Sequence, residues 1–335
     1  MTLTFKPHQL LFSFTLVMGI FIAVSSSSWF ILWMGLELNL MSFIPILAST
    51  SNQYSSESTL KYFLIQALGS ASLLAASPLS LIFFSSTFLI IILALLLKMG
   101  AAPFHFWFPP VMQGITWLQS LTLMTVQKFA PISMISALPT ESLSIILILA
   151  SILSSSVGAL GGLNQTLTRK IISYSSINHM AWLLGAVSFN EQMWLIYFFS
   201  YSAVSLSIIL ILRSNQIFHF SQLMSMGPSN KPLKLSIFLS LLSLGGLPPL
   251  LGFLPKMLII QEFISANASF LWLAILLFNA LLTLFFYLRI AVSSFLLANP
   301  KMKMSLYPKF TPSSLWVSFI NFSPIFYPLF LLAIY

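Results

Sequence analysis

The sequence contains no cysteine and no aspartate, and only 6% of its 335 residues are charged. Without cysteine the chain can hold no disulfide, no thiolate-bound iron–sulfur cluster and no cysteine zinc site. Soluble domains carry roughly 25% charged residues, so this low charge content excludes a water-soluble fold. The motifs G-x-G-x-x-G and G-x-x-x-x-G-K-[ST] are also absent, which argues against an NADH, flavin or ATP site in this chain.

Apolar residues dominate what is present. They make up 58% of the sequence and give a mean hydropathy of +0.99. The apolar runs reach about 20 residues, the length that a helix needs to cross the hydrocarbon layer and far more than a transmembrane β-strand needs. We therefore expect an all-α polytopic membrane protein.

The net charge of +9 does not indicate nucleic-acid binding, because the basic residues are scattered and form no basic stripe. The N-terminal segment MTLTFKPHQLLFSF runs directly into an apolar helix. It lacks both the cleavage site of a signal peptide and the Arg-rich character of a presequence. We expect insertion where the chain is made or by a dedicated insertase.

Eleven apolar segments, each bounded by turn or polar residues, are predicted to span the membrane. They cover about residues 8–25, 29–48, 58–84, 87–113, 116–137, 141–161, 166–188, 192–213, 233–262, 268–297 and 312–334. Eleven spans put the lysines and arginines near the span ends on one side, and Glu141, Glu191 and Glu262 on the other. By the positive-inside rule, the N-terminus then faces inside and the C-terminus outside.

Two of these spans are interrupted by glycine and proline. The fourth, LIIILALLLKMGAAPFHFWFPPVM, carries Gly100 and Pro103 next to Lys98. The ninth, LSLLSLGGLPPLLGFLPKMLII, carries a similar break next to Lys256. That break contains Gly245, Gly246, Pro248 and Pro249. Proline removes a helical hydrogen bond, and non-helical backbone at membrane depth occurs only where protein or a water-filled cavity covers it.

The two breaks occupy matching positions along the chain. Spans one to five (about 8–137) form one half and spans six to ten (about 141–297) the other, with a break in the fourth member of each. Because five is odd, the two copies would insert with opposite orientation. We predict a single transmembrane domain of two inverted five-helix repeats, followed by one C-terminal helix at about 312–334. Broken helices in corresponding positions point to a transport site; the alternative is two merely kinked helices.

Four charged side chains lie in the middle of apolar spans: Glu37, Lys98, Lys128 and Lys256. A charge at bilayer depth costs roughly 2.5–3.5 kcal/mol, and the default interpretation is an ion or proton path. Burial favours the neutral form of a lysine and a nearby carboxylate favours the charged form, so a lysine between these effects can take up and release a proton. We predict a relay in which Glu37 forms an ion pair with Lys98, Lys128 is the next station, and Lys256 lies towards the exit. A static pair that only fixes helix packing is the alternative.

His105, two residues after Pro103, and His179, in the middle of the seventh span, are weaker candidates for the relay. Histidine titrates near neutral pH, but either side chain could equally be a hydrogen-bonded packing residue. The serine and asparagine neighbours of His179 could hold waters between the stations. The eight tryptophans are interpreted as an interfacial belt or as packing.

The motifs WMGLELNLMSFIP, LLLKMGAAPFHFWFP, QKFAPIS, GGLNQT-x-x-RKIISYSSINHMAW and SLGGLPPLLGFLPK occur in this order. Together they closely resemble the subunit 2 family of NADH dehydrogenase, in its arthropod mitochondrial form. This family supplies an antiporter-like subunit to the membrane arm of respiratory complex I. The resemblance runs from about residue 8 to 297 and implies the antiporter fold. It maps the family's glutamate onto Glu37 and its lysines onto Lys98, Lys128 and Lys256.

The resemblance also implies the setting: a multi-pass subunit of the mitochondrial inner membrane that translocates protons for NADH:ubiquinone oxidoreductase. Its N-terminus would lie in the matrix and its C-terminus in the intermembrane space. Its partners would be other membrane-arm subunits, including neighbouring antiporter-like ones, supernumerary subunits and phospholipids such as cardiolipin, with no nucleic acid. It implies no cofactor or metal in this chain, because FMN, the iron–sulfur clusters and ubiquinone belong to other subunits of this translocase.

Two other functions stay open from the sequence. A free-standing cation/proton antiporter of related fold would exchange ions when reconstituted alone, although the short connections favour a chain embedded among partners. A purely structural subunit of the membrane arm would use its buried charges only as static ion pairs. The helix breaks beside Lys98 and Lys256 argue against this function.

Overall fold

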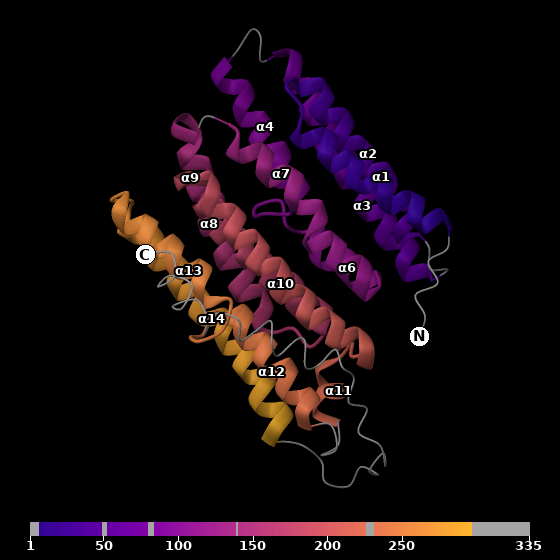
Figure 1. Cartoon of the computed structure of the whole chain (residues 1–335), viewed down its shortest axis with the longest axis vertical. Coiled ribbons are helices and arrows are strands. Elements are labelled where there is room, and N and C mark those ends of the chain that lie inside the picture. The colour runs from indigo at the N-terminus through magenta and orange to yellow at the C-terminus, as the bar shows by residue number, and fades with distance from the viewer. Residues whose placement is uncertain (1–6, 49–51, 80–83, 139, 226–230, 297–335) are drawn as a thin grey trace, which may run out of the picture. The chain divides into compact units, whose positions relative to one another are not determined.

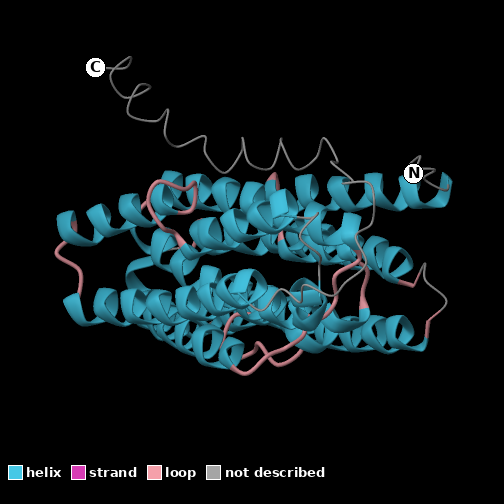
Figure 2. Cartoon of the chain, turned by 90° about the horizontal axis from the view of Figure 1, so that it is seen from below, coloured by secondary structure: helices cyan, strands magenta, loops and turns pink. Residues whose placement is uncertain are grey.

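The computed structural model describes residues 7–48, 52–79, 84–138, 140–225 and 231–296. These ranges form helices joined by loops (Figure 2), and the only β pairing within them is an isolated bridge between Leu167 and His219. The all-α class is thus confirmed for the described residues. The helices are α1 Pro7–Val24, α2 Trp29–Leu47, α3 Gln53–Leu79, α4 Phe84–Met99, α5 Phe108–Gly114, α6 Trp117–Met124, α7 Val126–Ser136, α8 Thr140–Leu163, α9 Thr168–Phe189, α10 Glu191–Asn215, α11 Phe220–Ser225, α12 Lys231–Gly245, α13 Phe253–Ser265 and α14 Phe270–Leu296.

The helices follow the predicted spans, including the two interruptions. The fourth span is divided into α4 and α5, and the ninth into α12 and α13. Two features were not expected: the fifth span is also divided, at Thr125 between α6 and α7, and α11 is an additional short helix. The predicted span at about 312–334 lies outside the described residues, so the count of eleven stays a prediction.

The chain forms two compact units, Met1–Ala150 and Ser151–Tyr335, with the boundary inside α8. In the first unit α1, α2 and α3 lie side by side (Figure 1) and α4 packs against α3 and α7. In the second unit α10 packs against α9, α12 and α13, and α14 packs against α12 and α9. Among the described residues six helices are long and apolar enough to cross a membrane: α1, α2, α3, α10, most of α8 and most of α14.

The surface of each unit is apolar and the interior holds polar groups. Phe14 and Phe278 are 65% and 62% exposed, whereas Lys98 and Lys128 are 6% and 2% exposed. Large exposed apolar patches mark surfaces that lipid or protein partners cover. Charged residues that face the interior of a helix bundle are typical of membrane proteins with an ion path.

Small residues set the closest helix contacts. A Cβ on Gly19 of α1 would lie 2.9 Å from the Gly35 carbonyl oxygen of α2, and a Cβ on Gly158 of α8 would lie 2.6 Å from the Asn178 backbone nitrogen of α9. Such close backbone approach is typical of helix pairs in membranes, where lipid is as apolar as the helices and packing drives association. These contacts fix α2 and α9, the helices that carry Glu37 and His179.

Candidate functional site

The first break begins directly after α4, at Gly100. This glycine has φ +71°, a left-handed conformation that other residues rarely adopt. Two side chains bond to carbonyl groups at this helix end, one of which, that of Leu97, also accepts from the Gly100 N–H at 3.2 Å. Trp107 Nε1 donates to the Leu97 carbonyl at 3.1 Å, and Gln66 Nε2 donates to the Lys98 carbonyl at 3.1 Å. Because unpaired backbone groups are costly at membrane depth, these two bonds stabilise the break.

Lys98 lies in the last turn of α4 and is buried. A Cβ on Gly69 of α3 would lie 3.1 Å from Lys98 Cγ, so this glycine makes room for the lysine side chain. A cavity of about 10 Å³ lies beside Lys98, close to the smallest space that holds one water. Its lining comes from α2, α3, α4 and α7: Leu36, Asn39, Leu40, Tyr62, Gln66, Lys98, Gln127 and Pro131.

Three polar side chains of this lining form a hydrogen-bonded chain that was not predicted. The Tyr62 hydroxyl donates to Gln127 Oε1 at 3.2 Å, and Gln127 Nε2 donates to Asn39 Oδ1 at 2.9 Å. Asn39 follows Glu37 by two residues on α2, and Gln127 directly precedes Lys128 on α7. The sequence could have pointed to Asn39 and Gln127, because each is a polar residue close to a charged one within an apolar span.

Glu37 and Lys98 interact without the direct ion pair that the sequence suggested. Glu37 is half-buried, and its charge acts on the Lys98 ammonium. Within the described ranges the only salt bridge joins exposed Lys61 to Glu57 at 2.5 Å. Lys98 instead lines a cavity that Asn39 and Gln127 also line, and its interaction with the Glu37 carboxylate is electrostatic, without a direct ion pair.

Lys128 on α7 is 2% exposed, and its ammonium has no hydrogen-bond partner among the described residues. It lies over the Phe108 ring, 4.5 Å from the ring centre. A desolvated cation–π contact contributes about 2 kcal/mol, whereas the effective desolvation penalty of a buried ion is several kcal/mol. Lys128 therefore needs a water or a period in the neutral form.

The helix around Lys128 is irregular on both sides. Thr125 Oγ1 bonds to the Leu121 carbonyl at 2.8 Å, and such back-bonding bends helices. Pro131 cannot donate to the Gln127 carbonyl four residues earlier. These two features disturb the regular helical hydrogen bonding of the fifth span on both sides of Lys128.

The second break begins at Gly246, which has φ +80°. A Cβ there would lie 2.9 Å from both Cδ and Nζ of Lys256. Lys256 is buried, and its Nζ donates to the Gly245 carbonyl at 2.8 Å, at the C-terminal end of α12. Cations are favoured at that end of a helix. The ammonium also lies 5.8 Å from the ring centre of Trp182 on α9.

The two breaks are similar but not identical. Each has one glycine in the left-handed region and one cis peptide bond, Ala102–Pro103 in the first and Pro248–Pro249 in the second. Lys98 lies in the helix before its break, whereas Lys256 lies in the helix after its break. Lys256 is consequently bonded across the break, and Lys98 lines a cavity.

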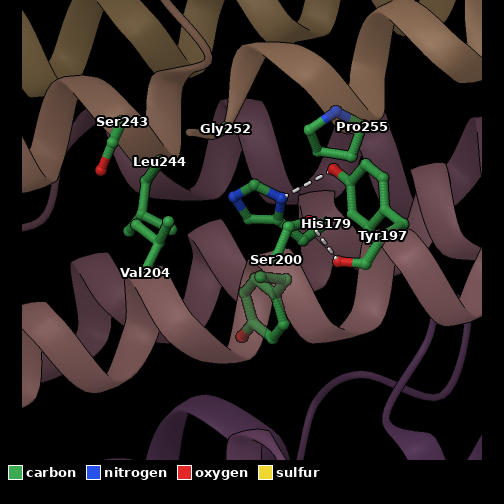
Figure 3. Close-up of a pocket in the computed structure, with 9 residues that line it drawn as sticks. His179, Tyr197, Ser200, Val204, Ser243, Leu244, Gly252 and Pro255 are labelled. Atoms are coloured by element: carbon green, nitrogen blue, oxygen red, sulfur yellow. Dashed lines mark hydrogen bonds between the residues drawn. The ribbon is translucent and has the colours of Figure 1, made fainter. Parts of the chain in front are cut away.

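His179 lies beside the second break. Its Nδ1 is 2.8 Å from the Tyr197 hydroxyl of α10, and the Tyr201 ring is 4.9 Å away between ring centres. Figure 3 shows one imidazole nitrogen turned towards the Tyr197 hydroxyl. His179 lies at a cavity of about 10 Å³. The cavity is lined by His179, Tyr197, Ser200, Tyr201, Val204, Ser243, Leu244, Gly252 and Pro255.

His105 lies within the first break and is also buried. Its ring packs on Phe106, with 4.2 Å between the ring centres. It does not line the cavity beside Lys98. These contacts favour a packing role, and a relay role for His105 stays a prediction. Trp107, interpreted as belt or packing, packs on Tyr62 and Phe108 and also donates a hydrogen bond to the Leu97 carbonyl near the end of α4.

The candidate relay residues thus form two groups. In the first unit Lys98 lines a cavity with the Tyr62–Gln127–Asn39 chain, and Glu37 and Lys128 lie close in sequence to Asn39 and Gln127. The second holds His179 and Lys256 at the second break. No group of His, Asp or Glu within the described residues could bind a metal ion. Chemically, the arrangement offers protonatable groups at depth with space for single waters.

Known proteins are similar to this sequence over most of its length. A family model described as NADH:quinone oxidoreductase/Mrp antiporter, transmembrane region, matches residues 26–87 and 79–283. NADH-ubiquinone oxidoreductase chain 2 of Anopheles gambiae is 44% identical over 329 residues, covering 94% of this chain and 95% of that protein. The proteins of the same name from Aedes aegypti and Loxodonta africana are 45% and 39% identical, covering 92% and 87% of this chain and the same shares of those proteins.

Solved structures show the same fold at lower identity. A chain of respiratory complex I from Thermus thermophilus has a TM-score of 0.83 at 23% identity, covering 97% of this chain and 79% of that chain. A chain of the Mrp complex from Dietzia sp. has a TM-score of 0.76 at 15% identity, covering 84% and 59%. The chain therefore belongs to the NADH:quinone oxidoreductase/Mrp antiporter family, and within it to the NADH-ubiquinone oxidoreductase chain 2 proteins.

Proposed function

We propose that this chain is a core membrane-arm subunit of NADH:ubiquinone oxidoreductase in the inner mitochondrial membrane. It translocates protons through buried glutamate and lysine side chains, coupled to quinone reduction in other subunits. Family membership supports the assignment to this complex and to proton translocation. The observation that carries the relay is Lys128, a lysine 2% exposed with no hydrogen-bond partner among the described residues, beside a hydrogen-bonded polar chain.

In the first unit, the proposed path connects Glu37, Lys98 and Lys128. An opposite charge nearby favours the charged form of a lysine, so Glu37 is proposed to help the relay hold a proton on Lys98. A water in the cavity beside Lys98 links this lysine to the neighbourhood of Lys128. Side-chain amides do not titrate in the physiological range, so Asn39 and Gln127 orient this water rather than carry the proton.

In the second unit, the proposed path includes His179 and Lys256. A charged lysine donates a stronger hydrogen bond than a neutral one, by roughly a factor of two. The bond from Lys256 to the Gly245 carbonyl therefore tightens when the lysine is protonated and loosens when it is neutral. Protonation at this station changes how firmly α13 is held to the end of α12, which gives proton movement a structural consequence.

The proposal includes the topology and the partners. Eleven spans in two inverted five-helix repeats (about 8–137 and 141–297) place the N-terminus in the matrix and the C-terminus in the intermembrane space. The one-sided distribution of lysine and arginine supports this orientation. Other membrane-arm subunits, supernumerary subunits and phospholipids would surround the chain, and other subunits would hold FMN, the iron–sulfur clusters and ubiquinone.

A free-standing antiporter is the second candidate, because the family model and the Mrp complex share this fold. The similarity to chain 2 proteins over 92–95% of their length favours the subunit of the oxidoreductase. Cation/proton exchange by this chain reconstituted alone would support the second candidate instead.

The test is Lys128→Ala in the assembled complex. We expect assembly and NADH oxidation by an artificial acceptor to be retained, while quinone reduction and proton pumping fall at least severalfold. Lys61→Ala is the control, because it removes an exposed lysine whose i,i+4 pair with Glu57 contributes only about 0.3–0.5 kcal/mol. Unchanged pumping by the Lys128 variant would remove this residue from the relay.

A further inference from the structure

We infer that a pocket at the end of α14 binds the phosphate group of a membrane phospholipid, with Arg289 as its main ligand. The lining comes from the loop between α8 and α9, from α11 and from α14: Asn164, Gln165, Thr166, Phe220, Arg289 and Ile290. None of the proposed relay side chains is among these residues, so the site does not depend on the relay and adds a lipid partner at a defined place.

The pocket is large, and its polar groups suit an anion. Its volume is about 390 Å³, within the range of roughly 300–1,000 Å³ for small-ligand sites. The Arg289 guanidinium supplies five N–H donors in a planar fork, and the amides of Asn164 and Gln165 and the hydroxyl of Thr166 can also donate. An arginine fork matches the oxygens of a phosphate group. Among the described residues, no acidic side chain lines the pocket.

Backbone contacts fix the walls of the pocket. The Phe220 N–H donates to the Thr166 carbonyl at 3.0 Å, which ties the start of α11 to the loop before α9. A Cβ on Gly162 of α8 would lie 2.8 Å from Phe286 Cε1 of α14, so this glycine lets α14 approach the end of α8 closely. Arg289 follows Phe286 by nearly one helical turn. The GGLNQT segment, noted in the sequence without a role, thereby forms one wall of the pocket beside the arginine.

The described part of the chain supplies no counter-charge for Arg289. The only salt bridge in these ranges joins Lys61 to Glu57. The second unit contains two glutamates, Glu191 and Glu262, and both lie at the far ends of their helices. Glu191 follows the end of α9, whereas the pocket adjoins its start, about 33 Å away at 1.5 Å per residue. Glu262 precedes the start of α14, whereas the pocket lies near its end. The counter-charge therefore comes from outside this unit.

The surroundings of Arg289 favour a lipid over a soluble phosphate. The arginine lies in the last turns of a helix that is long and apolar enough to cross a membrane. Leu281, Phe285 and Val292 of this helix are 64%, 59% and 47% exposed, and the spacing places exposed Arg289 on the same face as Phe285 and Val292. An acyl chain can lie along this apolar face while its phosphate reaches the guanidinium. Basic pockets beside the ends of membrane helices are typical sites for lipid headgroups.

The experiment compares Arg289→Gln with Arg213→Gln in the assembled complex. Each complex is placed in phosphatidylcholine nanodiscs that contain a small share of phosphatidylglycerol with a photo-reactive headgroup, and cross-links to the GGLNQT segment are measured by mass spectrometry. Arg213 lies in the last turn of α10 and does not line the pocket, so its variant removes an arginine elsewhere in the second unit. We expect about fivefold less cross-linking for Arg289→Gln, the effect of one basic residue near a membrane surface, and no change for Arg213→Gln.

A density map of the unmodified complex identifies the source of the phosphate and needs no variant. In phosphatidylcholine nanodiscs and phosphate-free buffer, we expect density within about 3.2 Å of the Arg289 guanidinium that continues as an acyl chain beside Phe285. Density that appears only in detergent with inorganic phosphate would indicate a soluble anion and overturn the lipid site, as would a side chain of a neighbouring subunit in the pocket. Equal cross-linking of all three complexes would also overturn it. Lys128→Ala tests the relay separately, and its outcome leaves this site unaffected.

Discussion

Gly246→Ala tests whether Lys256 acts from its place at the second break. The added Cβ would lie 2.9 Å from Lys256 Nζ and Cδ and 3.2 Å from the Gly252 carbonyl oxygen. These distances are too short for ordinary contacts, and the lysine is the more movable neighbour. The substitution should therefore push the ammonium away from the Gly245 carbonyl, which it bonds at 2.8 Å.

The size of the effect follows from two terms. A non-glycine residue in the left-handed region, here at φ +80°, costs roughly 1–2 kcal/mol. A hydrogen bond from a charged group contributes about 1.5–3 kcal/mol, so its loss lowers the occupancy of the bonded arrangement roughly 10- to 150-fold. The first term lowers stability, and the second changes the relay itself.

The assay is proton pumping per NADH oxidised by the assembled complex, with Gly185→Ala as the control. A Cβ on Gly185 of α9 would meet Trp272 at 3.6 Å, an ordinary contact, and alanine is the better helix former. We expect Gly185→Ala to pump normally and Gly246→Ala to lose at least tenfold, a factor within the range of the lost bond. Normal pumping by Gly246→Ala would refute the reasoning that the Lys256–Gly245 bond matters.

Two further predictions concern the first unit. Gln127→Leu should leave both the Tyr62 hydroxyl and the Asn39 amide without the partner that Gln127 supplies, at a cost of about 1–3 kcal/mol for each buried group. Proton pumping should fall, while assembly, measured on native gels, should persist. Unchanged pumping would contradict the role of the polar chain. Trp107→Phe removes one of two donors to the Leu97 carbonyl, which keeps the bond from the Gly100 N–H. The variant should lower the thermal stability of the complex by an amount that corresponds to about 1 kcal/mol, the net contribution of one hydrogen bond. An unchanged melting temperature would show that this bond is dispensable.

The breaks and the buried charges were predictable because their signals are local. Glycine and proline beside Lys98 and Lys256 indicate non-helical backbone wherever they occur in an apolar span, and the structure divides α4 from α5 and α12 from α13 there. A lysine amid apolar residues must face the interior of the bundle for the same local reason. Both inferences need no knowledge of which helices are neighbours.

The contacts between helices were not predictable in this way. The bond from Gln127 to Asn39 joins residues 88 positions apart, and nothing in either segment shows that they face each other. At the division of the fifth span, Thr125 bonds back to its own helix, and threonine makes the same bond within continuous helices, so the residue type alone does not predict a division. The direct ion pair expected between Glu37 and Lys98 is not formed in the structure. It was not predictable for a similar reason, because the distance between the two side chains depends on how α2 and α4 pack around α3.

The central claim is that Lys128 is held deep in the bundle and is nevertheless hydrated. A density map of the assembled complex that shows ordered waters tests it most directly. We predict a water within about 3.2 Å of Lys128 Nζ, a normal hydrogen-bond distance, and another in the cavity between Lys98 and Gln127. A Lys128 ammonium in dry apolar packing, or one that faces lipid, would contradict the account.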